Sequence, residues 1–301
     1  MLNIMVQGYK IPVVVLDLLI DNQEFHTAIK EYVNKKTPVV LYMRDTIDRH
    51  LDKFEFMDDY HQNYYICTAG PYWHPKNIVN LDTLVDSQQY NKDISITKKP
   101  SRIYDFLLMP GKAQVWRLEL VKALLEQNLL DNSLWSLCNP GGAIVPITER
   151  KMPEHYELEN LDMNKMIYQG ENHLNRVLVP SQYEDSRCSI VCETSISDDR
   201  VYLTEKTWKP LLAGHPFVAQ ANPGFFNYLK ELGFKTFSNI WSEEDYSLNG
   251  LVEVCKDIKN MDESEFLDLT FDICEHNSIH AKEKNWIREF HLEQLRSKNL
   301  I

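Results

Sequence analysis

The sequence lacks any apolar run of the length that a membrane helix needs. A membrane span takes about 20 consecutive apolar residues, and the longest apolar stretch here, Ile11 to Ile20, is interrupted by Asp17. The first residues also show no basic segment followed by an apolar one, so we expect no secretory signal. These two absences predict a cytoplasmic protein with no membrane span.

Cysteine is scarce in the chain. Its 301 residues include six cysteines, too few for a disulfide scaffold of this length. Cys188 and Cys192 lie four residues apart on an expected strand, where they share a face but are too far apart to bridge. No accompanying set of histidines and cysteines suggests zinc. We therefore expect all six to be small core residues with reduced thiols.

Basic residues are fewer than acidic ones, with 32 Lys and Arg against 44 Asp and Glu. The net charge of -12 argues against broad binding to nucleic acid, although a local basic groove stays compatible with it. No group of Asp, Glu or His has a spacing that compels a divalent metal site, and no Asp-x-Asp motif follows a strand in the second half. We expect neither a metal nor a cofactor.

The first part of the chain alternates between helix and strand patterns. A chain of this length makes two domains or one large one. Residues 24–35 have helical periodicity, and residues 37–43 and 64–67 are apolar runs typical of buried parallel strands. Polar residues 86–100 have the composition of a linker. We predict an α/β domain over residues 1–98.

The second part opens with a strand–helix–strand pattern. Residues 102–108 predict a strand, 114–127 an amphipathic helix and 134–137 the next strand, which together form a βαβ unit. This unit begins a second α/β domain over residues 100–275. Further expected elements are strands at 188–192, 215–219 and 235–237, a helix at 225–232, and closing helices at 243–274 and 279–298.

Two cations follow the first strand of this unit. Lys112 and Arg117 lie near the carboxyl end of that strand and the start of the helix, where ligands bind in open α/β sheets. Arg117 is also compatible with a solvated helix position. Because neither Arg117 nor Lys206, discussed next, belongs to an apolar stripe, we expect their replacement to change stability little.

A second helix start has the features of an anion site. Thr204 is a good N-cap, and Gly214 stands where a C-cap glycine belongs. The unpaired N–H groups and the dipole of a helix N-terminus suit a phosphate. Glu205 suits that dipole, but Lys206 does not, so Lys206 more plausibly binds an anion. An ordinary surface helix is the alternative, and Pro210 predicts a kink or a late start.

These residues resemble the sequence signature of α1,3-fucosyltransferases. In that family a Phe-Glu-Asn-Ser element precedes a Tyr-x-Thr-Glu-Lys-x-Trp element. Here Cys192-Glu-Thr-Ser195 precedes Tyr202-Leu-Thr-Glu-Lys-Thr-Trp208, with Thr194 in place of the usual Asn. The likeness continues through Ala213-Gly214 and Pro216-Phe-Val218, and Arg117 looks like the family's phosphate-binding arginine.

The resemblance implies a GT-B-like fold of two Rossmann-type domains facing a cleft, with the C-terminal helix at 279–298 returning to the first domain. It implies that the second domain holds a nucleotide sugar. Lys206 and Arg117 would face its diphosphate, and Glu205 the sugar or ribose. The nucleotide-sugar site implied in this way comprises Lys112, Arg117, Glu193, Thr194, Ser195, Tyr202, Thr204, Glu205 and Lys206.

An inverting sugar transfer also needs one general base near the acceptor hydroxyl. Asp45 follows one expected strand of the first domain, and His74 stands in an aromatic loop after another. Either residue is also compatible with an ordinary loop position, and we slightly favour Asp45 as the base.

The sequence therefore predicts a metal-independent, inverting glycosyltransferase that uses a nucleotide-diphosphate sugar and a saccharide acceptor. One alternative is transfer to hydroxymethylated DNA bases, as phage enzymes with GT-B folds do. That alternative requires a basic patch, for which the candidates are Lys10, Arg44, Arg49, Lys98 and Lys99. Another alternative is a non-catalytic binding or scaffolding protein. The oligomeric state is not predicted.

Overall fold

The computed structural model describes backbone for five N-terminal strands, and backbone with side chains for most of the chain from residue 102 onward. The described residues are 2–6, 9–16, 39–43, 64–67, 78–79, 102–111, 114–136, 178–193, 196, 201, 203–245, 247–283, 293 and 296. The predicted helix at 24–35 lies outside them.

The chain divides into two compact units. Unit 1 comprises residues 1–85, 199–203 and 283–301, and unit 2 comprises residues 86–198 and 204–282. Each unit has its own sheet, so each is described by itself.

The sheet of unit 1 has five strands in sequence order. They are β1 (Leu2–Val6), β2 (Tyr9–Leu16), β3 (Val39–Met43), β4 (Tyr64–Cys67) and β5 (Ile78–Val79). Strand β1 is antiparallel to β2, whereas β2 to β5 run parallel to one another. The strands predicted at 37–43 and 64–67 are therefore confirmed as β3 and β4.

The sheet of unit 2 has four parallel strands. They are β6 (Tyr104–Leu108), β7 (Leu134–Trp135), β8 (Ser186–Cys192) and β9 (Phe217–Gln220), in the order β7-β6-β8-β9. All seven residues of β8 are buried. A parallel strand covered on both faces has this pattern, and the expected α/β class is confirmed.

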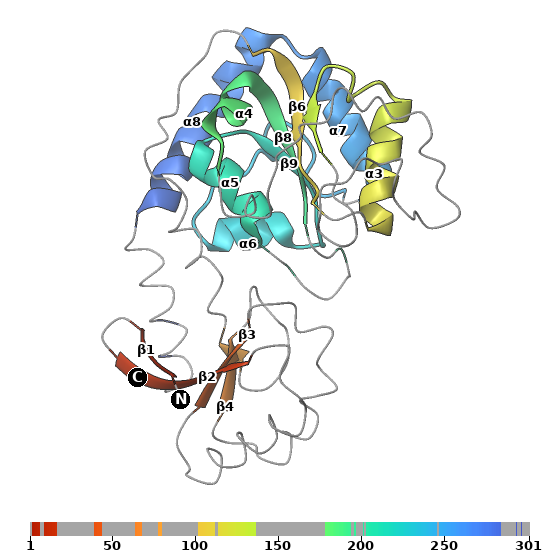
Figure 1. Cartoon of the computed structure of the whole chain (residues 1–301). Helices are drawn as coiled ribbons and strands as arrows, with labels where there is room; N and C mark the ends of the chain where they lie inside the picture. The colour runs from red at the N-terminus through yellow and green to blue at the C-terminus, as the bar shows by residue number, and fades with distance from the viewer. Residues whose placement is uncertain are drawn as a thin grey trace. The chain divides into compact units, whose positions relative to one another are not determined.

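Helices cover both faces of this sheet (Figure 1). α3 (Val115–Glu126) and α7 (Leu248–Asn260) lie on one face, and α4 (Pro180–Asp185), α5 (Glu205–Ala213) and α8 (Glu263–Lys282) lie on the other. The short helix α6 (Phe225–Glu231) follows β9.

The chain winds in opposite directions from the two central strands. From β6 it passes through α3 to β7 on one side, and from β8 through α5 to β9 on the other side. The boundary between β6 and β8 is therefore a topological switch point, at which open α/β sheets bind ligands beyond the carboxyl ends of the strands. α3 and α5 are the helices that follow these two strands.

Helix α5 begins and ends where the sequence predicts. The Thr204 hydroxyl accepts a hydrogen bond from the Lys206 N–H at 3.4 Å, and Gly214 adopts the left-handed conformation with φ 58°. Pro210 lies inside the helix, which nevertheless begins at Glu205, so the expectation of a late start is wrong.

The strand predicted at 235–237 is absent from the described segment 203–245, where the sheet has only β9. Side chains bind its backbone instead. The Asn277 amide accepts from the Lys235 N–H at 2.9 Å and donates to the Lys235 carbonyl at 2.8 Å. The Phe237 N–H donates to Glu243 Oε1 at 2.6 Å. These hydrogen bonds satisfy backbone N–H and C=O groups of Lys235 and Phe237 that a neighbouring strand would bind if the segment were part of the sheet.

The predicted boundaries of the closing helices are also wrong. The chain breaks between α7 and α8 at residues 261–262, where Asp262 Oδ1 accepts the Ser264 N–H at 2.9 Å as an N-cap. α8 then continues through the expected gap at 275–278. Asn277 and Ser278, which suggest a loop by residue type, are buried in this helix, and the Ser278 hydroxyl donates to the Leu212 carbonyl at 2.8 Å.

The described cysteines of unit 2 are core residues. Cys188, Cys192, Cys255 and Cys274 are buried free thiols, as the sequence predicts. Burial raises the pKa of Cys188 and of Cys192 to about 12, so both stay protonated and unreactive at neutral pH.

We expect His215 to make the stability of unit 2 sensitive to acid. Its ring is buried, with Nδ1 2.9 Å from Ser189 Oγ and Nε2 2.8 Å from the Ser186 carbonyl. Burial, together with the charge of Arg102, lowers the pKa of His215 to about 3. In the unfolded chain that pKa is about 6.5, so the unfolded state binds more protons between these two values.

We therefore expect the free energy of unfolding to fall as the pH drops below about 6.5, by at most about 1.4 kcal/mol per pH unit for this one proton. Urea unfolding between pH 7.5 and 5 measures the slope. The His215→Gln variant should lose part of this slope, and a slope identical to that of the wild type would contradict the assignment.

Candidate functional site

Arg117 lies at the switch point and is buried. The side chain is 3% exposed, and its Nη2 donates to the backbone carbonyl of Glu193 at 3.0 Å. This bond joins the first turn of α3 to the residue that follows β8. The alternative of a solvated helix position is therefore excluded, and replacing Arg117 should cost stability, contrary to the expectation from the sequence.

Glu193 is fully buried and binds the start of α5. Its Oε1 accepts from the Thr204 N–H at 3.0 Å and from the Thr207 hydroxyl at 2.5 Å. Its Oε2 accepts from the Thr204 hydroxyl at 2.7 Å. The carboxylate therefore fixes the first turn of α5 against the carboxyl end of β8, which makes Glu193 a positioning residue.

Gly111 shows that Arg117 and Lys206 approach the same point. This glycine has φ +77°, and a Cβ added to it would lie 3.7 Å from Arg117 Nη1 and 3.8 Å from Lys206 Cε. The charges of both residues also act on the Cys192 thiol, where they oppose the effect of burial on its pKa. Two cations from two helices thus meet beside one glycine at the carboxyl ends of β6 and β8.

Lys206 is paired with the residue that precedes it. Its Nζ lies 2.9 Å from Glu205 Oε1 and 3.3 Å from Thr204 Oγ1, and the Lys206 and Glu205 side chains are 13% and 29% exposed. Burial is the largest single effect on the pKa of Glu205 and raises it, but the charge and the hydrogen bond of Lys206, together with smaller contributions, outweigh burial, and the pKa is lowered. The carboxylate is therefore ionised at neutral pH.

Lys209 adds a third cation one turn further along α5. It is buried, and burial lowers its pKa to about 8, although the charge of Glu205 acts in the opposite direction. Glu205 thus interacts electrostatically with two lysines. The sequence does not predict Lys209, Thr207 or Gly111 as site residues. Glu205 and Lys209 are four residues apart on one helix, however, and this spacing indicates that their side chains can interact.

The predicted site residues divide into two groups. The structure brings together Arg117, Glu193, Thr204, Glu205 and Lys206. The others, Asp45, His74, Lys112, Thr194, Ser195 and Tyr202, lie outside the described residues, so their roles stay predictions.

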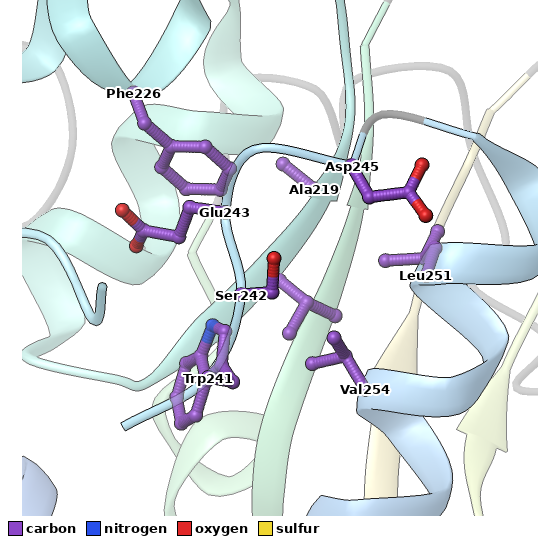
Figure 2. Close-up of a pocket in the computed structure, with 9 residues that line it drawn as sticks. Ala219, Phe226, Trp241, Ser242, Glu243, Asp245, Leu251 and Val254 are labelled. Atoms are coloured by element: carbon purple, nitrogen blue, oxygen red, sulfur yellow. The ribbon is translucent and has the colours of Figure 1, made fainter. Parts of the chain in front are cut away.

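A pocket also lies beside β9 (Figure 2). Its apolar lining consists of Val218, Ala219, Phe226, Trp241, Leu251 and Val254. Glu243 adds a carboxyl group whose pKa is raised by burial, while its Oε1 accepts the Phe237 N–H. No lysine or arginine is among the described residues that line the pocket. The pocket therefore does not suit a diphosphate. The cationic cluster, which we define as Arg117 and Lys206 beside Gly111 with the neighbouring Glu193, Thr204, Glu205 and Lys209, does suit one.

Comparison with known proteins does not assign the chain to a family. No protein-family model matches the sequence, and no curated protein matches it. Within the part of the chain that the structure describes, no helix is both long and apolar enough to cross a membrane. In the same part, no group of three or more His, Cys, Asp and Glu residues could hold a metal ion. The cationic pair of Arg117 and Lys206 and the motif around it are therefore the features of the chain that bear on its function.

Proposed function

We propose that the protein is an inverting glycosyltransferase that transfers a sugar from a nucleotide-diphosphate sugar to a hydroxyl group, without a metal ion. One observation carries this proposal: the side chains of Arg117 and Lys206 meet beside Gly111 at the switch point of a parallel sheet. A departing diphosphate gains negative charge in the transition state, and fixed cations stabilise that charge.

The motif around the cluster supports the same activity. The segments 192–195 and 202–208 resemble the α1,3-fucosyltransferase signature, and their described residues pack together through Glu193 and Thr204. In our proposal the fold is of the GT-B type, unit 2 holds the nucleotide sugar and unit 1 binds a saccharide acceptor. Asp45 or His74 of unit 1 would act as the general base.

Four described residues of the cluster then have roles in the proposal. Arg117 and Lys206 bind the diphosphate, and Glu205 faces the sugar or the ribose. The hydrogen bonds that the Glu193 carboxylate accepts from Thr204 and Thr207 favour a role for Glu193 in holding α5 in position. Glu193 thus acts indirectly, because it positions the first turn of α5, which bears Lys206.

A thermal-shift panel of UDP-, GDP-, dTDP- and CMP-sugars tests the proposal. A ligand at 100 times its Kd stabilises the native state by about 2.7 kcal/mol, so one nucleotide class should raise the Tm clearly. Transfer or slow hydrolysis of that sugar nucleotide then separates an enzyme from a binding protein. A panel with no shift, at concentrations up to several millimolar, would contradict the proposed function.

Activity should survive removal of divalent metal ions. The proposal assigns the leaving-group charge to Arg117 and Lys206, so no Mg²⁺ or Mn²⁺ is required for the diphosphate to depart. The measurement is the transfer rate in excess EDTA, with and without added MnCl₂. Complete loss in EDTA that is restored by manganese would show that a metal carries this charge.

A further inference from the structure

Lys206 already has an anionic partner in the free protein. Its Nζ is 2.9 Å from Glu205 Oε1, which is the distance of a charge-assisted hydrogen bond. The Lys206 side chain also lies beside Gly111, where Arg117 Nη1 approaches from α3. The Glu205 carboxylate therefore binds the same ammonium group that a phosphate oxygen of the ligand would need.

Glu205 can leave this position more readily than Glu193 can. Both carboxylate oxygens of Glu193 are bound by Thr204 and Thr207 inside the protein. The Glu205 side chain is 29% exposed, so water can solvate it when it moves. Lys209 stands four residues further along the helix and already interacts with Glu205, and a Glu that precedes a Lys by four residues is a favourable helical pair.

We propose that Glu205 occupies the phosphate position on Lys206 in the free protein, and that a diphosphate ligand displaces it toward Lys209. The exchange replaces one anionic acceptor on Lys206 by another, so Lys206 is never left without a counter-charge. This inference rests on the proposed function, because it takes the diphosphate of a nucleotide sugar as the ligand. It makes Glu205 a residue that limits the affinity for the anion.

Binding of inorganic pyrophosphate, measured by isothermal titration calorimetry on the full chain, tests the displacement. Glu205→Gln keeps the size of the side chain but removes the competing charge. We expect this variant to bind pyrophosphate about 10-fold more tightly than the wild type, a gain of about 1.4 kcal/mol. The matched control is Glu253→Gln, which removes the exposed partner of Lys256 on α7 and should leave the affinity unchanged.

A double-mutant cycle separates displacement from a general effect of charge. In the Lys206→Ala background, Glu205→Gln should give no gain, because the ammonium group for which both anions compete is missing. An equal gain in both backgrounds would overturn the inference. Thermal unfolding of each variant shows that it is folded.

The two proposals fail in different ways. If the wild type binds pyrophosphate and Glu205→Gln binds it equally or more weakly, the displacement is wrong and the proposed function stands. If neither the wild type nor Glu205→Gln binds pyrophosphate or any nucleoside diphosphate, the proposed function is wrong and the displacement falls with it.

Discussion

Replacing Lys206 by alanine should lower kcat/KM for sugar transfer by about 10²–10³, because an interaction with a developing phosphate charge contributes about 2–4 kcal/mol in the transition state. The free energy of unfolding should change by less than about 1 kcal/mol, since the ion pair with Glu205 is partly exposed and such pairs stabilise weakly. Steady-state kinetics with the nucleotide sugar found by thermal shift, together with urea unfolding, measure both effects.

Two further variants make this result specific. Lys256→Ala removes a lysine of α7 that pairs with Glu253 at 2.8 Å, outside the cluster, and should leave kcat/KM unchanged. Arg117→Ala should lower kcat/KM as much as Lys206→Ala does, but it should also destabilise unit 2, because its guanidinium is buried and holds the Glu193 carbonyl. If Lys206→Ala and Lys256→Ala have equal kcat/KM, Lys206 does not bind the diphosphate.

Replacing Glu193 by alanine should destabilise unit 2 by about 3–5 kcal/mol, the largest stability effect that we expect. The change leaves the Thr204 N–H and the hydroxyls of Thr204 and Thr207 without the carboxylate that accepts from all three. Buried donors that lose their acceptor cost much more than a hydrogen bond contributes on average. Urea unfolding followed by circular dichroism measures the change.

Two further substitutions with smaller expected effects on stability serve as comparisons for Glu193→Ala. Thr207→Val removes one of the three donors and should cost about 1 kcal/mol. Glu253→Ala removes an exposed carboxylate and should have almost no effect. If Glu193→Ala unfolds at the same urea concentration as the wild type, these hydrogen bonds do not determine the position of α5.

Features that depend on neighbouring residues could be predicted from the sequence. The Thr204 cap and the Gly214 terminus of α5 follow from residue types within one helix. The strand predicted at 188–192 lies within β8 (Ser186–Cys192). The βαβ unit of β6, α3 and β7 was likewise readable from its alternating periodicities.

Features that depend on residues far apart in the sequence could not be predicted in this way. The backbone at Lys235 is bound by Asn277, which lies 42 residues further along the chain, so a local strand pattern is misleading there. The same asparagine lies within the last third of α8, where its tertiary hydrogen bonds offset its low helix propensity. Tertiary contacts therefore determine both the absence of a strand at residues 235–237 and the helical conformation of Asn277.

The candidate site was predictable in composition but not in arrangement. The sequence indicates that Arg117, Glu193 and Lys206 belong together through their motif. The convergence of Arg117 and Lys206 beside Gly111 depends on the strand order β7-β6-β8-β9, which places the starts of α3 and α5 next to each other. Strand order is a long-range property that no single segment encodes.

Glu193 has a consequence for the kind of ligand that the cluster selects. Its backbone carbonyl holds Arg117, and its side chain holds the turn that bears Lys206. One residue therefore fixes both the Arg117 guanidinium and the backbone turn from which the Lys206 side chain extends. Affinity should depend on the distance between the anionic groups of a ligand, so a diphosphate that reaches both cations should bind better than two separate monophosphates.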